Sequence, residues 1–351
     1  MTVLNPRPTP ALLGDAVRML PRPDVIASLP VLILYPHSRC NCRCLMCDIW
    51  RDTGREEISV EDVSRWVAEW RELGVQRIVL SGGEALLHSR IWEVCDVIRG
   101  ADIGISILST GLLLARHAES LVQRCDDVVV SLDGPQEIHD LIRNVPRAYE
   151  RLGEGIAALK SASQLVTVSA RCTVQQANHR SLRATVRAAH ALSLDRISFL
   201  AADVSSTAFN RPEGWDASRS AQVAVRREDL PGLEEELAAL ETEHADDFAS
   251  GFIAETPLKL RQRLLAYYSA LHGDGDFVPN QCNAPWVSAV IEADGAVRPC
   301  FFHPSLGNVR EQPLEQIINS EHAVAWRRNL DVTKDETCRK CVCTLSLQTT
   351  T

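Results

Sequence analysis

Short apolar segments alternate with longer amphipathic segments through the first two hundred residues of the chain. The apolar segments are predicted to be strands at residues 31–35, 76–81, 103–109, 127–133, 165–174 and 196–201. Between them, apolar residues at helical spacing predict helices at 59–74, 89–99, 112–124, 146–162 and 179–192. Strands that alternate with helices indicate a parallel sheet with functional loops at the carboxyl ends of its strands. An open six-unit barrel and a doubly wound sheet both fit this pattern.

The alternation ends after residue 202. Two further helices are predicted at 228–247 and 256–272. Residues 286–300 predict a β-hairpin that turns at Asp294 and Gly295, because this dipeptide favours tight hairpin turns. The pattern therefore divides the chain into a lead-in at 1–30, an α/β core at 31–202, a helical linker or lid at 203–281 and a C-terminal segment at 282–351.

Composition and charge narrow the class of protein. The chain has 351 residues and a formal net charge of −9, which argues against nucleic acid or an anionic membrane as its main partner. No apolar run reaches the roughly 18 to 20 residues that cross a bilayer, and the N-terminus lacks a signal-peptide core. We therefore expect a cytoplasmic protein, in which clustered cysteines indicate a metal site or catalysis rather than disulfides.

Four of the twelve cysteines are crowded directly after the first predicted strand, at Cys40, Cys42, Cys44 and Cys47. Cys40, Cys44 and Cys47 form a C-x3-C-x2-C motif. Three thiolates on a [4Fe–4S] cluster leave one iron without a protein ligand, and an open position is typical of a catalytic metal centre. The alternative is a zinc site that also uses Cys42, which we otherwise expect to be a bystander.

A second cysteine group lies near the end of the chain. Cys282 and Cys300 bracket the predicted hairpin, and Cys338 and Cys341 form a C-x2-C pair. Their four thiolates are enough to complete a second [4Fe–4S] cluster. A structural zinc ribbon uses the same four ligands and is the alternative. Cys343 is either a spare thiol or a replacement for Cys341.

The first cysteine motif resembles that of the radical SAM superfamily, although Met46 stands where the family usually has an aromatic residue. The resemblance implies a partial (β/α)6 TIM-like barrel. It implies that S-adenosylmethionine (SAM) fills the open position on the cluster through its amino and carboxylate groups. An electron from the reduced cluster would then cleave SAM to a 5′-deoxyadenosyl radical, which abstracts hydrogen from a substrate.

The same resemblance assigns SAM contacts after the next strands. The stretch "LSGGEALLH" is similar to the family's Gly-Gly-Glu-Pro motif, with Ala85 in place of proline. Gly82 and Gly83 would let the backbone approach the ligand, and Glu84 would accept from the SAM ammonium group. Thr110, after the third strand, would lie near the ribose.

The fourth strand has a mixed face and an apolar face. Val129, Ser131 and Asp133 alternate with apolar residues, so the mixed face is expected to line the cavity. The stretch "SLDGPQEIHDLIR" resembles the subfamily with additional clusters and implies that Ser131 and Arg143 contact SAM, with Arg143 pairing with its carboxylate. Asp133 either touches the ligand or caps the loop. By the same resemblance, Val174 lies where the family packs adenine.

The second cysteine group resembles the short "twitch" version of the SPASM domain, which implies a small α+β domain with one auxiliary [4Fe–4S] cluster. The resemblance therefore implies a radical oxidoreductase that acts on a small molecule or a peptide and passes the substrate's electron to the auxiliary cluster. An external donor such as flavodoxin or ferredoxin would reduce the SAM cluster. The short lead-in favours a small substrate over a leader-bound peptide.

Three alternatives stay open. One is a peptide-modifying enzyme, and another is a non-catalytic cysteine-rich metal-binding protein. The third is a redox-neutral epimerase, which needs a thiol that returns hydrogen to the substrate radical. The thiols that the two sites leave unassigned are Cys42, Cys95, Cys125, Cys172 and Cys343.

Overall fold

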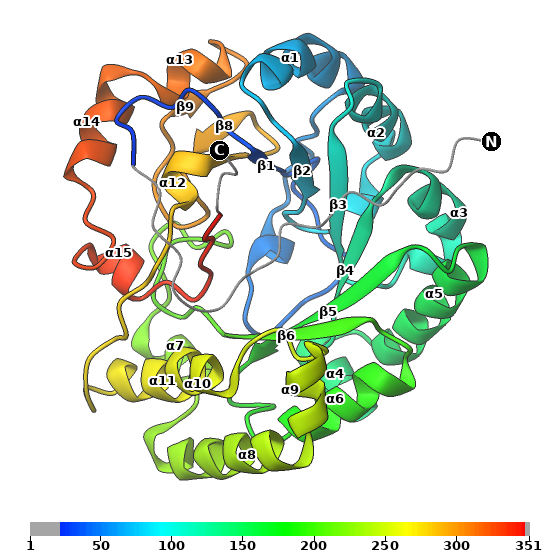
Figure 1. Cartoon of the computed structure of the whole chain (residues 1–351), viewed down its shortest axis with the longest axis vertical. Helices are drawn as coiled ribbons and strands as arrows, with labels where there is room; N and C mark the ends of the chain where they lie inside the picture. Colours follow the sequence, from blue (N-terminus) through cyan, green and yellow to red (C-terminus); the bar gives the residue numbers. More distant parts are fainter. Residues whose placement is uncertain (1–21, 348–351) are drawn as a thin grey trace.

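The computed structural model describes residues 22–347, so most of the predicted lead-in and the last four residues lie outside the described residues. A little over half of this range, up to Ala201, forms a run of parallel strands with helices between them (Figure 1). The elements of this barrel are β1 (Val31–Leu34), α1 (Val60–Glu72), β2 (Arg77–Leu80), α2 (Ile91–Gly100), β3 (Gly104–Ser109), α3 (Leu114–Arg124), β4 (Asp127–Ser131), α4 (Gln136–Arg143), α5 (Ala148–Ala162), β5 (Thr167–Val174), α6 (Leu182–Ala191) and β6 (Arg196–Ala201).

Helices dominate the remainder of the chain. They continue with α7 (Ala217–Val223), α8 (Leu230–Glu243), α9 (Ala245–Ser250), α10 (Pro257–Leu260) and α11 (Ala266–Leu271). The C-terminal segment holds α12 (Ala284–Val287), β7 (Ser288–Ile291), β8 (Ala296–Arg298), β9 (Gly307–Asn308), α13 (Leu314–Ile318), α14 (Glu321–Asn329) and α15 (Glu336–Arg339). The helix predicted at 256–272 forms α10 and α11, which a π-helical turn at Arg261–Leu265 connects.

The strands form one sheet in the order β6-β5-β4-β3-β2-β1-β7-β8-β9. The first six strands are parallel in chain order, and in Figure 1 the sheet curves with α1, α2, α3, α5 and α6 outside it. This arrangement confirms the predicted partial (β/α)6 barrel. It places the carboxyl ends of six strands, and the loops that follow them, around one opening.

The predicted hairpin forms and extends the sheet of the barrel. Strand β7 lies parallel to β1, with Val31 opposite Ser288 and Leu34 opposite Ile291. The β1–β7 ladder continues where the Tyr35 N–H donates to the Ile291 carbonyl at 2.9 Å. Strands β8 and β9 then add antiparallel neighbours. The second cysteine group is therefore attached to the edge of the barrel by backbone hydrogen bonds.

Local sequence signals explain the elements that position the site. Helix α1 begins at a capping box in which Ser59 Oγ accepts from the Asp62 N–H at 3.0 Å and Asp62 Oδ2 accepts from the Ser59 N–H at 3.1 Å. Helix α4 lies in a stretch where the sequence predicted no helix. Its buried face carries the polar residues His139 and Arg143, which conceal the helical periodicity.

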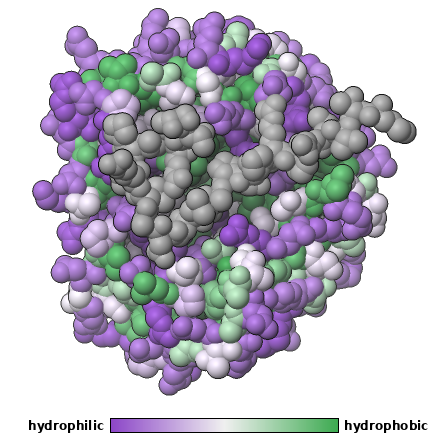
Figure 2. Space-filling view, viewed as in Figure 1, coloured by the Kyte–Doolittle hydropathy of each residue, from purple (hydrophilic) through white to green (hydrophobic). Residues whose placement is uncertain are grey.

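The described residues include no helix that is long and apolar enough to cross a membrane. Hydrophilic side chains cover much of the described surface that is visible in Figure 2, and hydrophobic ones are scattered among them. The apolar residues instead form a core between the sheet and its helices. This core includes the alternate residues Val128, Val130 and Leu132, which the predicted parity of β4 directs toward the helices.

Candidate active site

The loop that carries the first cysteines is fixed between two other parts of the barrel. The Arg43 N–H donates to the Arg143 carbonyl at 3.1 Å, and the Leu45 N–H donates to the Ile142 carbonyl at 3.0 Å. On the other side, the Arg39 carbonyl accepts the N–H of Glu84 at 3.0 Å. The end of α4 and the glycine loop after β2 therefore hold the cysteine loop at the opening of the barrel.

Three of the four crowded cysteines line one cavity. Cys40, Cys44 and Cys47 line a space of about 240 Å³ together with Arg143 and residues from the ends of β3, β4 and β5. Cys42 is only 1% exposed and is not among the lining residues. The three thiols of the C-x3-C-x2-C motif therefore face a common space, and this donor set fits a [4Fe–4S] cluster that keeps one position for a second ligand.

The environment of these thiols differs from one to the next. Burial raises the pKa of Cys40 and of Cys47 to about 12. A hydrogen bond with the Cys42 thiol lowers the pKa of Cys44 to about 7, and the nearby Arg143 guanidinium also lowers it. A thiol binds iron as its thiolate, and of these three thiols Cys44 has the lowest pKa.

The glycine loop meets the cysteine loop at van der Waals distance. A Cβ atom on Gly83 would lie 2.0 Å from the Arg39 carbonyl oxygen. Gly82 has a φ of +94°, and its Cβ would lie 2.8 Å from the Tyr35 ring. Only glycine fits at these two positions, and both glycines line the cavity.

The structure places Glu84 away from the cavity surface. Its fully buried carboxylate accepts from Ser109 Oγ at 3.0 Å, from the Thr110 N–H at 2.7 Å and from Thr110 Oγ1 at 2.6 Å. Burial raises its pKa, and the Thr110 donors oppose that rise. Glu84 thus joins the β2 and β3 loops in this structure, whereas the expected contact with the SAM ammonium group would require its carboxylate at the cavity.

Asp133 and Arg143 form an ion pair beside Cys44. The Arg143 Nη2 atom lies 2.6 Å from Asp133 Oδ2, and Nη1 lies 3.6 Å from the Cys44 sulfur. Asp133 also accepts the Thr173 N–H at 2.9 Å. Burial raises the pKa of Asp133, and the Arg143 cation opposes that rise. Of the two expectations for Asp133, the structure shows the carboxylate bonded within the protein, where it orients Arg143 toward the cavity.

The other predicted SAM contacts divide into two groups. Thr110 and Ser131 line the cavity, as does Arg143. Val174 is fully buried and is not a lining residue, and its carbonyl accepts from the Tyr268 hydroxyl at 2.6 Å. His139 accepts the Asp133 N–H at 3.2 Å, and burial together with the Arg143 charge lowers the pKa of His139 to about 3.

The second cysteine group lines an adjacent cavity of about 290 Å³ in the lumen of the barrel. Its lining includes the thiol residues Cys282, Cys300, Cys338, Cys341 and Cys343. Burial raises the pKa of Cys341, and the nearby thiols of Cys343 and Cys282 raise it further. This set of thiols supplies enough ligands for a fully coordinated [4Fe–4S] cluster. His303 also lies here, with its Nε2 atom 3.3 Å from the Cys338 sulfur.

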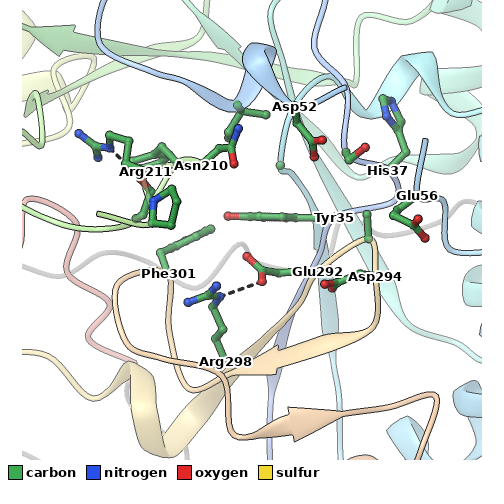
Figure 3. A pocket seen from close by; sticks show the side chains of 18 of the residues that line it. Tyr35, His37, Asp52, Glu56, Asn210, Arg211, Glu292, Asp294, Arg298 and Phe301 are labelled. Atoms are coloured by element: carbon green, nitrogen blue, oxygen red, sulfur yellow. Dashed lines mark hydrogen bonds and ion pairs between the residues drawn. The ribbon is translucent and has the colours of Figure 1, made fainter. Parts of the chain in front are cut away.

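Aromatic residues around the opening were not among the predicted site residues. Tyr35 and Phe301 line a cavity beside the cysteine loop (Figure 3). This cavity has a volume of about 320 Å³, and the two rings stack with their centres 6.0 Å apart. In the same cavity, Arg298 pairs with Glu292 at 2.9 Å. The available signal was position in the sequence, because Tyr35 follows the first strand and Phe301 follows Cys300.

Comparisons with known proteins agree with this geometry. Residues 34–188 match the family described as the Radical SAM superfamily, and residues 282–342 match SPASM, described as an iron-sulfur cluster-binding domain. The first match covers the barrel as far as helix α6, and the second covers Cys282, Cys300, Cys338 and Cys341.

The chain is similar to two curated relatives over different lengths. An AdoMet-dependent heme synthase of Oleidesulfovibrio alaskensis is 28% identical over 131 residues, which are 35% of this chain and 33% of the relative. An Fe-coproporphyrin III synthase of Methanosarcina barkeri is 26% identical over 82% of this chain and 73% of the relative. The chain thus spans only a third of the length of the first relative.

Two solved structures share the fold. Streptococcus suis SuiB bound to S-adenosylmethionine is 14% identical, with a TM-score of 0.63 over 91% of this chain and 73% of that chain. Native anSMEcpe with bound AdoMet is 19% identical, with a TM-score of 0.63 over 89% of this chain and 86% of that chain. At these identities the likeness extends to the arrangement of the barrel and the C-terminal segment.

Proposed function

The chain belongs to the radical SAM superfamily and carries a SPASM domain, so it uses SAM and [4Fe–4S] clusters, and from this premise we propose that it is a radical oxidoreductase. When bound, these groups supply a 5′-deoxyadenosyl radical at the first site and an electron acceptor at the second. The proposed net reaction is a two-electron oxidation of a small molecule or a peptide side chain, with hydrogen abstraction as its first step on the substrate.

One observation carries the proposal, namely that the two thiol-lined cavities share a wall. The residues common to both are Leu108, Val129, Arg171, Phe301, Phe302 and Cys343. A substrate at this boundary would lie between the first and second cysteine groups. The apolar side chains there would exclude water from a reactive intermediate.

The side chains of this chain would bind and orient the reactants. Cys40, Cys44 and Cys47 are the proposed ligands of the SAM cluster. Arg143 is proposed to pair with the SAM carboxylate, for which a planar guanidinium is well suited. The Asp133 carboxylate forms an ion pair with Arg143 and so orients its guanidinium. Cys282, Cys300, Cys338 and Cys341 are the proposed ligands of the auxiliary cluster.

A redox-neutral epimerase is the second candidate, and the position of Cys343 favours it. Of the five unassigned thiols, Cys343 is the one that lines both cavities. By contrast, Cys95 and Cys172 are fully buried and line neither. In this reaction the Cys343 thiol would give its hydrogen atom to the substrate radical, and an external donor would return one electron and one proton to the sulfur.

The substrate class stays open between a small molecule and a peptide. The names of the two curated relatives described above concern porphyrins, other curated relatives are named as probable GTP 3',8-cyclases, and one of the solved neighbours was determined with a precursor peptide, SuiA. We propose a cytoplasmic location, an external donor such as flavodoxin or ferredoxin, and no nucleic-acid partner, in keeping with the net charge of −9.

Formation of 5′-deoxyadenosine from SAM tests the proposed chemistry. We expect the anaerobically reconstituted protein to form it under dithionite and the C44A variant to lose this activity. The matched control is C95A, because Cys95 lies on the buried face of helix α2 and lines neither cavity. An inactive parent protein, or an active C44A variant, would contradict the proposal.

The metal content and the product separate the remaining candidates. About eight iron atoms per chain would support two [4Fe–4S] clusters, whereas about four irons and one zinc would contradict the auxiliary cluster. Solvent deuterium at one carbon of an otherwise isomeric product would favour the epimerase. A product two electrons more oxidised than the substrate would favour the oxidoreductase.

A further inference from the structure

Arg171 is a cation in the lumen of the barrel that has no partner among the side chains of the described residues. Arg171 on β5 lines both thiol cavities and is the only charged residue in the wall that they share. Its buried Nε atom has no acceptor. Within residues 22–347, no hydrogen bond or ion pair joins its guanidinium to another side chain or to the backbone. This arginine therefore keeps its donors available to a ligand.

The strand fixes the direction of the Arg171 side chain. Its neighbours Ala170 and Cys172 are buried on the opposite face of β5, against the helices. Across the sheet, Arg171 lies opposite Ser131 on β4 and Ser198 on β6. The guanidinium consequently enters the lumen at the level of Ser131, which lines the cavity of the first cysteine group.

Other charged groups around the two cavities already have partners. Arg143 is paired with Asp133, and the Asp127 carboxylate lies 3.0 Å from Arg77. The Glu255 carboxylate is close enough for the Arg171 charge to oppose the rise in its pKa that burial causes, but it bonds the Phe199 N–H at 3.1 Å. An unpaired cation in a largely apolar space is costly, and a bound anion would offset that cost.

We propose that Arg171 binds an anionic group of the substrate, either a carboxylate or a phosphate. Its planar guanidinium can donate two parallel hydrogen bonds to such an oxyanion. Leu108, Val129 and the two phenylalanines of the shared wall would contact the apolar remainder of the molecule. The proposal rests on the proposed function, because it takes the boundary between the two cavities as the substrate site.

Binding of small anions to the holoenzyme tests this assignment without turnover. The protein carries both clusters and saturating SAM, with no reductant, so that Arg143 is already occupied. The probes are ¹³C-labelled acetate and methylphosphonate, with acetamide as the neutral analogue of acetate, and their NMR relaxation is followed. We expect at least one anion to bind saturably and acetamide not to bind. The tighter of the two anions identifies the substrate group.

The second experiment compares anion binding by an Arg171 variant with anion binding by the wild type. We expect R171Q to weaken anion binding by at least about tenfold, as the loss of a charge-assisted hydrogen bond predicts. The matched control is R298Q, because Arg298 lines the neighbouring cavity but is already paired with Glu292. It should bind the anion within about twofold of the wild type. Equal anion binding by R171Q and the wild type would overturn the proposal.

Two further measurements separate a role of Arg171 in substrate binding from a role in SAM binding and from a folding defect of R171Q. The affinity for SAM is compared in wild type and R171Q, and a tenfold loss would assign Arg171 to the SAM carboxylate and overturn the proposal. If R171Q does not fold, the wild-type comparison of acetate, methylphosphonate and acetamide still tests the proposal. A wild-type protein that binds neither anion would contradict it. Absence of 5′-deoxyadenosine formation in the same wild-type preparation would contradict the proposed function separately, because anion binding needs no SAM cleavage.

Discussion

At the scale of single residues, Arg143 connects a buried carboxylate to a cysteine of the first group. Its side chain is 8% exposed and that of Asp133 is 0% exposed, and 2.6 Å separate their nearest atoms. The guanidinium also reaches the Cys44 sulfur at 3.6 Å. A buried ion pair of this kind need not add much net stability, but removal of one partner leaves a charge that water cannot solvate.

We expect R143Q to lower the free energy of unfolding of the cluster-free protein by about 3 kcal/mol, because Asp133 would then be buried without its cation. The measurement is anaerobic urea unfolding. The control is R147Q, since Arg147 forms an exposed pair with Glu150 and its loss should cost less than about 1 kcal/mol. Equal losses in the two variants would contradict the structural role of the buried pair.

The sequence predicted which residues share a site where these residues lie close together along the chain. The three thiols of the first motif follow one strand and are only a few residues apart, so their convergence on one cavity follows from the sequence. The hydrogen-bond partners of Glu84 were not predictable, because Ser109 and Thr110 lie at the end of another strand. Arg171 was visible only as one member of an alternating strand. That no side chain of residues 22–347 pairs with it depends on every element that lines the lumen.

At the scale of elements, loops rather than strands form the first site. The loop after β1, the glycine loop after β2 and the end of α4 are joined by backbone hydrogen bonds. The closest approach is at Gly83, where an added Cβ would meet the backbone of Arg39 rather than a mobile side chain. The positions of the cysteines consequently depend on a glycine more than 35 residues farther along the chain.

We expect G83A to displace the cysteine loop and to reduce the iron bound after anaerobic reconstitution from about eight to about four atoms per chain, since only the first cluster would be lost. The matched control is G100A at the end of α2, where an added Cβ meets no atom within 4 Å. This control should keep its iron and gain stability slightly, because alanine favours helices. Full iron content in G83A would show that the loop can adjust.

Helices and strands were predicted where the sequence has a clear helical or alternating pattern. The six parallel strands and the hairpin have clear alternation or turn residues, and they form at the expected places. Helix α4 was missed because His139 and Arg143 occupy its buried face. The pairing of β7 with β1 was also not predicted, since neither strand carries a local signal for a partner so distant in the sequence.

At the scale of the whole molecule, one sheet includes both thiol-bearing parts of the chain. Ile291 in β7 is fully buried, and its carbonyl accepts from the Tyr35 N–H at the end of β1. The apolar core likewise includes residues from the barrel and from the C-terminal segment. We therefore expect the two parts to unfold together.

Truncation of Ile291 to alanine tests this coupling. We expect I291A to destabilise the cluster-free protein by roughly 2–4 kcal/mol and to lower the melting temperature of the barrel in the same single calorimetric transition. V25A, at a residue that is 56% exposed, should have little effect. Two separate transitions, with only the smaller one shifted in I291A, would show that the C-terminal segment unfolds on its own.

The pairing of β1 with β7 also has a consequence for synthesis. The ribosome adds roughly 5–20 residues per second, so β7 is made roughly 13–50 s after β1, which lies about 250 positions earlier. Until then β1, which is central in the finished sheet, has an open edge of unpaired backbone groups. The nascent barrel is thus exposed to wrong strand pairing until β7 has been synthesised.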